Sequence, residues 1–168
     1  EALEDGKAAA SILSSSLPSS KRGDIRFAFD GDAVLFSDEA EKEYQKNGLK
    51  DFLSTEKNLA NVPLRGGPFR SFVESLNQLK SEFIGDTNPI RTALVTARSS
   101  PAHERVVKTL RSWGMSVDES LFLGGMEKAA FLNSYGADIF FDDQAEHCRI
   151  ASETVLAGHV PSGVKNRT

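Results

Sequence analysis

The chain has 168 residues, of which 39% are hydrophobic and 26% charged, with a formal net charge of −4 and one cysteine. This length suits one domain with a substantial core, and a single cysteine excludes an internal disulfide and fits a reducing compartment. The acidic balance argues against a nucleic acid polymer as partner, because such binding relies on Lys and Arg. No apolar run approaches the ~20 residues of a membrane helix, and the N-terminus lacks a signal-peptide pattern. We expect a cytoplasmic protein without a membrane partner, and a homo-oligomer stays open.

The first elements along the chain are expected to be short. An Ala-rich helix over residues 1–12 and a Ser-rich linker precede an apolar strand at residues 25–29. Residues 38–47 are charged and typical of a helix that ends at Gly48. Apolar residues at helical spacing then predict an amphipathic helix over residues 69–83.

Strands and helices alternate in the second half of the chain. We expect one helix that Ser100 caps and Pro101 begins, a second that ends at Gly136, and a third after Asp143. The alternation predicts an α/β fold with a doubly wound, mostly parallel sheet covered on both faces. The strands of this half are expected at residues 91–95, 120–123, 137–141 and 155–160.

Polar side chains stand where the predicted strands end or where a helix begins. Ligands bind beyond the carboxyl ends of the strands in such sheets, so we expect these side chains to meet in one site. Each of them taken alone is compatible with a turn, a helix cap or a solvated surface position. The set consists of Asp30, Asp32, Thr96, Lys128, Asp142 and Asp143.

The Asp-Gly-Asp sequence after the first apolar strand carries the clearest chemistry. Asp30 and Asp32 are two positions apart, so in an extended chain their side chains point the same way. Two unpaired carboxylates repel each other and favour a cation beside them, and Mg²⁺ prefers such oxygen ligands. An ordinary Asp-Gly turn is the alternative. A calcium-binding EF-hand loop is excluded, because Leu35 stands where that loop requires glycine.

The order of these residues resembles the four motifs of the haloacid dehalogenase-like phosphatases. The longer segments 27–38, 93–99 and 139–144 resemble the cytosolic type I 5′-nucleotidase family, especially its bacterial members. The segments 110–114 and 159–161 add to this resemblance, which covers residues 25–163. Members of the family extend further upstream, so we expect the chain to be a carboxyl-terminal portion or a trimmed form.

The resemblance implies a fold and an activity. The fold would be a haloacid dehalogenase-like, Rossmann-like core over residues 25–36 and 89–168, with a small helical cap inserted at residues 37–88. Residues 1–24 would form the N-terminal helix and linker. The activity would be the magnesium-dependent hydrolysis of nucleoside 5′-monophosphates to nucleoside and phosphate, through an aspartyl-phosphate intermediate.

The resemblance also implies roles for the residues that match its motifs. Asp30 would be the nucleophile, and Asp32 would be the general acid and base. Asp30 and Asp143 would bind Mg²⁺ through their side chains and Asp32 through its backbone carbonyl. Asp142 would bind the metal through water or orient a neighbour.

Other residues are expected to contact the substrate. Thr96 and Lys128 would offset the charge of the phosphate, together with Ala97 and Arg98 beside them. Three aromatic residues of the cap region are candidates to stack on the base, and core packing is the alternative for each. They are Phe36, Phe69 and Phe72.

Two other functions use related residues. A phosphatase or phosphotransferase for other small phosphate esters would carry the same four motifs. A non-catalytic, phospho-accepting receiver domain also uses acidic residues, a Thr and a Lys. The receiver is disfavoured because Lys128 precedes Asp142 in this chain and because Asp32 supplies an acid and base for turnover.

Overall fold

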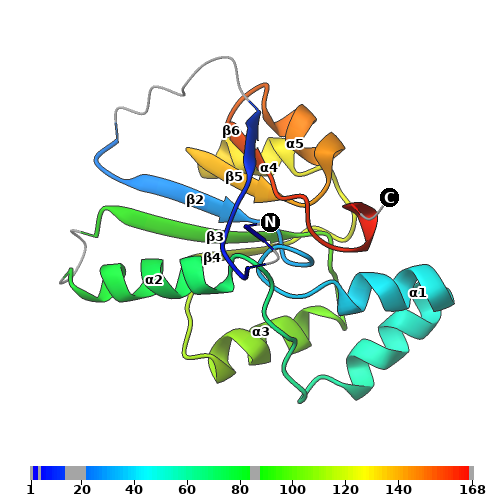
Figure 1. Ribbon diagram of the computed structural model, residues 1–168. Coiled ribbons are helices and arrows are strands. Elements are labelled where there is room, and N and C mark those ends of the chain that lie inside the picture. Colours follow the sequence, from blue (N-terminus) through cyan, green and yellow to red (C-terminus); the bar gives the residue numbers. More distant parts are fainter. Residues whose placement is uncertain (1, 4, 14–21, 84–87, 167–168) are drawn as a thin grey trace.

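The computed structural model describes residues 2–3, 5–13, 22–83 and 88–166. These residues build one six-stranded sheet with the strand order β1-β6-β5-β2-β3-β4, and all neighbouring strands are parallel except β1, which runs antiparallel to β6 (Figure 1). The expected α/β fold with a mostly parallel sheet is confirmed. The strands are β1 (Ser11–Leu13), β2 (Ile25–Phe29), β3 (Ile90–Thr96), β4 (Glu119–Phe122), β5 (Ile139–Asp142) and β6 (Leu156–His159).

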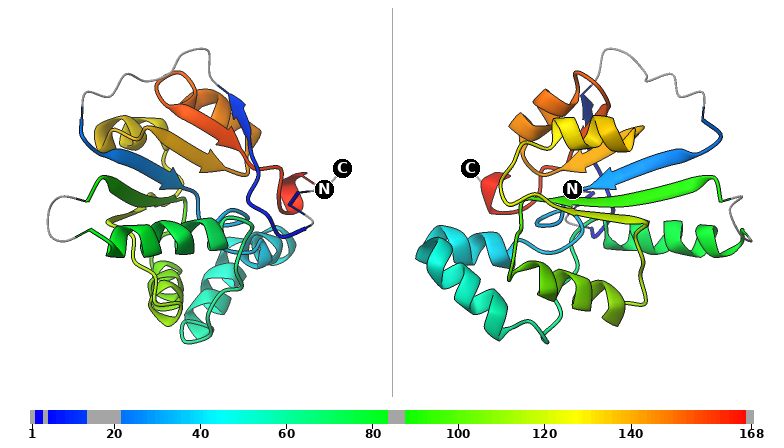
Figure 2. Two further views of the ribbon diagram at one scale, coloured as in Figure 1. Left: turned by 60° about the vertical axis from the view of Figure 1, so that its left-hand side comes forward. Right: turned by 180° about the vertical axis from the view of Figure 1, so that it is seen from behind.

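Helices cover both faces of the sheet. Helices α2 (Arg70–Ser81) and α3 (His103–Ser112) lie on one face, and α4 (Ala129–Tyr135) and α5 (Ala145–Ala151) lie on the other (Figures 1 and 2). Side chains alternate between the two faces along each strand. Phe29 therefore belongs to the core cluster under α2 and α3, while the preceding Ala28 belongs to the cluster under α4 and α5. The sheet is thus doubly wound, as the alternation of elements predicted.

The register of the central strands decides where the polar residues meet. Strand β2 lies between β3 and β5, and Phe29 is paired with Leu94 on one side and Phe141 on the other. The next residue, Asp30, donates its backbone N–H to the carbonyl of Phe141 at 2.8 Å. The ends of β2, β3 and β5 are therefore level, and the residues that follow them share one edge of the sheet.

The predicted N-terminal helix is wrong. Residues 11–13 form the edge strand β1, in which Ser11 is paired with His159 and Leu13 with Ala157. The described residues before β1 form turns and irregular chain. Pairing with β6 outweighs the weak helix preference of the alanines, since local propensity is small beside tertiary contacts. The Ser-rich segment at 14–20 lies outside the described residues.

Two helix boundaries also differ from expectation. Helix α3 begins at His103 after a turn, and no side chain caps it, so Ser100 is not its cap. Helix α1 (Glu39–Asn58) does not end at Gly48, but this glycine interrupts it with φ 79° and ψ 177°. Gly136 ends α4 in the left-handed conformation, as predicted.

The two helices of the expected cap segment, 37–88, differ in their packing. Val73 and Leu76 of α2 belong to the same buried cluster as Phe29 and Leu94 of the sheet, so α2 is a layer of the core. Helix α1 instead lies beside the end of the sheet to which β2 and β3 point (Figures 1 and 2). Among the described residues, no helix combines the length and the apolar character needed to cross a membrane.

Candidate active site

A small pocket opens at the carboxyl ends of the central strands. Its volume is about 50 Å³, and its walls come from the ends of β2, β3 and β5, the start of α4, and the C-terminal helix η2 (Val164–Asn166). The pocket unites residues that are far apart in the sequence, as the strand-end argument predicted. The expected site residues on its walls are Asp30, Asp32, Thr96, Ala97, Lys128 and Asp143.

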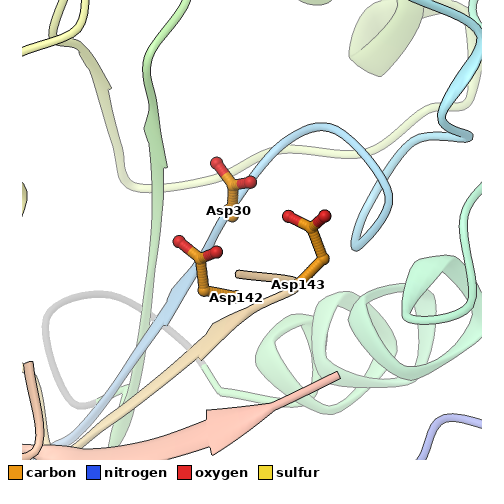
Figure 3. A group of neighbouring side chains, drawn as sticks. All are labelled: Asp30, Asp142 and Asp143. Carbon is orange, nitrogen blue, oxygen red and sulfur yellow. The ribbon is translucent and has the colours of Figure 1, made fainter. Parts of the chain in front are cut away.

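Three buried carboxylates form the acidic part of the site. Asp30, Asp142 and Asp143 each offer an oxygen, and these oxygens all lie within 4.8 Å of one another (Figure 3). Asp30 follows β2, whereas Asp142 ends β5 and Asp143 is the next residue. Close oxygen ligands of this kind suit a hard divalent cation. The described residues therefore contain a cluster that fits a metal ion.

Lys128 neutralises part of this charge. Its Nζ lies 2.7 Å from Oδ1 of Asp30 and 2.6 Å from Oδ2 of Asp142. Although burial lowers the pKa of Lys128, the carboxylates of Asp30 and Asp142 outweigh burial and raise this pKa above its usual value. The side chain is therefore a buried ammonium beside the carboxyl group of Asp30.

The remaining negative charge is insufficiently compensated by protein groups. Burial, together with the nearby Asp30 and Asp142, raises the pKa of Asp143 from 3.8 to about 8. Burial also raises the pKa of Asp30 to about 6, although Lys128 opposes this effect. A bound divalent cation would favour the ionised form of both groups, since opposite charge lowers a carboxyl pKa.

Asp142 differs from Asp143 because protein groups surround its carboxylate. It accepts hydrogen bonds from the backbone N–H of Gln144 at 2.8 Å and from Lys128, and His147 Nδ1 lies 3.1 Å away. Although burial raises the pKa of Asp142, Lys128 and His147 outweigh it and lower this pKa. Within the described residues, no hydrogen bond reaches the carboxylate of Asp143, which leaves its oxygens open to the pocket.

The residues after β3 are placed in two different ways. Thr96 is buried, and its Oγ1 accepts a hydrogen bond from the backbone N–H of Arg98 at 3.3 Å. Ala97 also lines the pocket. The side chain of Arg98 does not, because its guanidinium pairs with Asp32 and Glu56. The expected contact of this side chain with the substrate phosphate is therefore not supported.

The aromatic residues proposed for base stacking lie in the core. Phe36 is fully buried, and its ring centroid lies 5.5 Å from that of Trp113. The ring centroids of Phe69 and Phe141 are 4.6 Å apart. Phe72 packs edge-on against Phe69 at 5.8 Å. None of the three lines the pocket, so the structure gives the predicted base contacts no support. The apolar pattern of this segment reflects burial under the sheet.

Sequence reasoning missed several residues around the pocket. Lys165 of η2 lines the pocket, and its Nζ lies 3.3 Å from Glu41 of α1 and 3.2 Å from Gln144. The carbonyl of Asp143 accepts a hydrogen bond from Asn166 at 2.7 Å. These residues stand in segments without a motif, and only the return of the C-terminal segment to the strand ends brings them to the site.

A larger cavity adjoins the small pocket. Its volume is about 480 Å³, which lies within the range of small-molecule sites. Its walls share residues with the small pocket, among them Ala97 and Lys128, and Met126 and Ile150 add apolar surface. A molecule whose phosphate occupies the small pocket has room to extend into this cavity.

The fold and this site define a class of protein. A mostly parallel α/β sheet that gathers an Asp-x-Asp sequence, a Thr, a Lys and an acidic pair at its strand ends is the core of the haloacid dehalogenase-like proteins. Within that class, the model of the family described as 5′-nucleotidase matches residues 1–167. The chain therefore belongs to the 5′-nucleotidase family.

One human protein illustrates the relationship. The chain is 41% identical over 153 residues to human cytosolic 5′-nucleotidase 1B, and the match covers 88% of this chain. It covers 25% of the human protein, so the chain spans about a quarter of the length of this relative. No solved structure matches the chain.

Proposed function

We propose that the chain hydrolyses nucleoside 5′-monophosphates to nucleoside and phosphate in a magnesium-dependent reaction. The observation that carries this proposal is the meeting of Asp30, Lys128 and Asp143 in one pocket of a 5′-nucleotidase family member. The name of the human relative includes the word cytosolic, and we propose a cytoplasmic location for this chain as well. Membership of the family removes the receiver-domain alternative.

The metal site would use the acidic cluster. Asp30 and Asp143 would bind Mg²⁺ through carboxylate oxygens, and Asp32 through its backbone carbonyl. The hydrogen bonds that already surround Asp142 support an orienting role for this residue, in which it holds Lys128. When bound, the cation supplies positive charge that offsets the repulsion between a phosphate dianion and an attacking carboxylate.

The first chemical step would transfer the phosphoryl group to the protein. A carboxylate oxygen of Asp30 attacks phosphorus, and the bond between phosphorus and the 5′-oxygen of the nucleoside breaks. Asp32 gives its proton to that oxygen, so the nucleoside leaves as a neutral alcohol. Lys128, already 2.7 Å from the Asp30 carboxylate, stabilises the transferred charge. Thr96 and the backbone at Ala97 would hold the phosphate oxygens.

The second step would release phosphate. Water attacks the phosphorus of the aspartyl-phosphate while Asp32 takes one of its protons. The bond between phosphorus and the Asp30 oxygen breaks, which regenerates the carboxylate and frees inorganic phosphate. Asp32 lines the pocket and its side chain is 22% exposed, so water reaches it.

We place the nucleoside in the larger cavity. This cavity borders the proposed phosphate site through Ala97 and Lys128, and its volume of about 480 Å³ suits a small molecule. Met126, which is 57% exposed, and Ile150 offer apolar surface to a base. This position replaces the aromatic residues that the sequence suggested.

The test measures phosphate release from the full chain with and without Mg²⁺, using ribo- and deoxyribonucleoside monophosphates and several sugar phosphates. Magnesium-dependent release from nucleotides, far above release from sugars, supports the proposal. Release from sugar phosphates alone would keep the mechanism and discard the nucleotide. No release from a folded sample that binds Mg²⁺ would contradict activity of this chain. Asp30→Asn serves as the control and is expected to abolish release.

A further inference from the structure

Among the described residues, the carboxylate of Asp32 is held by one buried side chain, that of Arg98. Nε of Arg98 lies 2.8 Å from Oδ2 of Asp32, and Nη2 lies 2.8 Å from Oδ1. The side chain of Arg98 is only 3% exposed. Two parallel hydrogen bonds from a planar guanidinium fix both the position and the plane of a carboxylate. The orientation of Asp32 therefore depends on where Arg98 stands.

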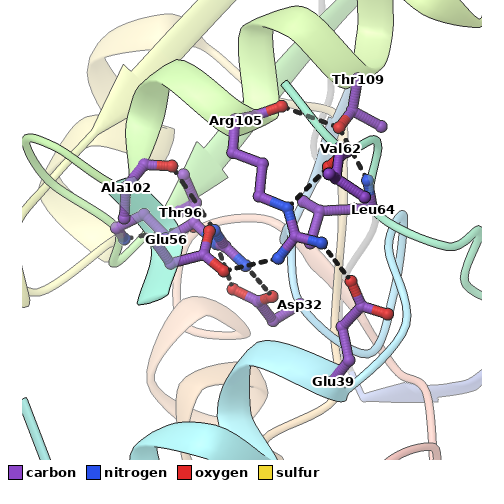
Figure 4. A network of polar contacts seen from close by, with 10 residues as sticks. Asp32, Glu39, Glu56, Val62, Leu64, Thr96, Ala102, Arg105 and Thr109 are labelled. Atoms are coloured by element: carbon purple, nitrogen blue, oxygen red, sulfur yellow. Dashed lines mark hydrogen bonds and ion pairs between the residues drawn. The ribbon is translucent and has the colours of Figure 1, made fainter. Parts of the chain in front are cut away.

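Arg98 is held in turn by Glu56 of helix α1. Its Nη1 forms an ion pair with Oε2 of Glu56, which is almost fully buried. Oε1 of Glu56 also accepts a hydrogen bond from Nη1 of Arg105 at 2.7 Å. Nη2 of Arg105 donates a hydrogen bond to Oε1 of Glu39 at 2.9 Å (Figure 4). The network thus connects both ends of α1 with the loop that carries Asp32.

The charges in this network cannot be rearranged independently. Buried charges are tolerated only when they are paired and hydrogen-bonded. Although burial lowers the pKa of Arg98, Asp32 and Glu56 outweigh burial and raise it, so the guanidinium stays charged. Removing the Glu56 carboxylate would leave Nη1 of Arg98 with only the long hydrogen bond to the carbonyl of Ala102, at 3.5 Å. The guanidinium would then be free to move, and Asp32 would follow.

The two hydrogen bonds from Arg98 leave Asp32 able to exchange a proton. A carboxylate has about four lone-pair positions, and the guanidinium uses one on each oxygen. Asp32 lines the pocket beside Asp30 and Thr96, and its side chain is 22% exposed, so the hydrogen bonds from Arg98 do not shut it off from the pocket. Arg98 itself does not reach this pocket, so it acts on the reaction only through Asp32.

We propose that Arg98 is a positioning residue for the proton transfers of Asp32, and that Glu56 anchors Arg98 from helix α1. The proposal rests on the proposed function, in which Asp32 protonates the leaving group. A positioned acid or base contributes roughly 10²–10⁴-fold to a rate. A misplaced Asp32 is therefore expected to slow the steps that need its proton and to spare the others.

The experiment varies the leaving group. A nucleoside leaves as an alkoxide unless it is protonated, whereas p-nitrophenolate leaves readily without a proton. The rate of enzyme phosphorylation is measured by rapid quench with a nucleotide and by the burst of p-nitrophenolate with p-nitrophenyl phosphate. Arg98→Lys keeps the positive charge but cannot form the two parallel hydrogen bonds to Asp32. We expect it to lower the nucleotide rate about 10–100-fold and the burst rate by less than about 3-fold.

Arg105→Lys is the matched control, and a double variant guards against misfolding. Arg105 is as buried as Arg98 and shares Glu56, but it forms no hydrogen bond or ion pair with Asp32. It is expected to change the two rates by the same factor. The double variant Arg98→Gln with Glu56→Gln removes one charge of each sign, so it leaves no new net charge, and it should show the same leaving-group dependence as Arg98→Lys.

The outcomes separate this inference from the proposed function. If Asp32→Asn slows the nucleotide selectively but Arg98→Lys slows both substrates equally, Arg98 is only structural and the inference is overturned. If Asp32→Asn itself shows no dependence on the leaving group, the acid role of Asp32 is wrong and the inference falls with it, whereas the proposed function is overturned only by the absence of magnesium-dependent phosphate release. Selective loss in both variants, with Arg105→Lys non-selective, supports the positioning role.

Discussion

Replacing Asp143 by Asn should stabilise the metal-free protein while it abolishes the proposed metal-dependent activity. Asp143 is 4% exposed, and its carboxylate stands beside two other carboxylates without a hydrogen-bond donor of its own in the described structure. Asn has nearly the same shape and carries no charge. The substitution therefore removes repulsion from Asp30 and Asp142 without opening a cavity.

The magnitude follows from the pKa of the carboxyl group. A pKa raised from 3.8 to about 8 means that, at pH 7, folding costs Asp143 about 4 kcal/mol relative to the unfolded chain. Relaxation and water penetration reduce such costs, so we expect Asn to raise the free energy of unfolding by about 1–3 kcal/mol. Because the folded pKa is the higher one, the penalty is absent below pH 3.8 and grows as pH rises toward 8.

The assay is urea denaturation in EDTA at pH 5 and pH 8, with Asp142→Asn as the matched control. Asp142 is also buried but has Lys128, His147 and a backbone N–H around its carboxylate. Its substitution should lower the free energy of unfolding by about 1.5–3 kcal/mol, since it weakens charge-assisted hydrogen bonds. In excess Mg²⁺ the wild type should gain stability through binding, and Asp143→Asn should gain little.

Two results would refute the reasoning. One is an Asp143→Asn protein that is no more stable than the wild type at pH 8 in EDTA. The other is a stabilisation that is as large at pH 5 as at pH 8, because it would come from packing and not from charge. Phosphate release retained by this variant in Mg²⁺ would separately remove Asp143 from the metal site.

Three further predictions concern other parts of the molecule. Burial raises the pKa of Cys148 to about 12, so iodoacetamide at pH 8 should label the thiol only after unfolding, and rapid labelling of the native chain would contradict its burial. A Cβ at Gly67 would overlap the carbonyl oxygens of Val34 and Phe36, so Gly67→Ala should lower the free energy of unfolding by about 1–3 kcal/mol, measured in urea. Ile150→Trp fills the proposed nucleoside cavity and should raise KM for a nucleotide while inhibition by inorganic phosphate stays constant; an unchanged KM would place the nucleoside elsewhere.

Much of the fold and of the candidate site was predictable from local patterns. Strand ends are visible as apolar runs that stop at polar residues, and parallel strands bring such ends together whatever lies between them. This argument predicts that Asp30, Thr96 and Lys128 lie at one edge of the sheet, and in the structure all three line one pocket. The alternation of strands and helices likewise predicted a doubly wound sheet, because it depends on periodicity alone.

Other features follow only from contacts between distant segments. An aromatic residue near a site motif has the same sequence pattern whether it packs in the core or binds a ligand. Only the structure shows that Phe69 belongs to a buried core cluster. Residues 11–13 became a strand because β6 offered them a free edge. The different surroundings of Asp142 and Asp143 depend on Lys128, which lies 14 residues before Asp142 in the sequence.

The sequence alone thus determined which polar side chains gather at the strand ends, because the periodicity and the ends of strands are local properties of the sequence. Only the tertiary structure decided which charged groups pair. Arg98 meets Asp32 across 66 positions and Glu56 across 42, and no spacing rule connects such residues. Burial then made the pairing specific, since a charge removed from water is stable only beside its opposite. Arg98, which the sequence suggested as a contact for the substrate phosphate, therefore pairs with Asp32 instead.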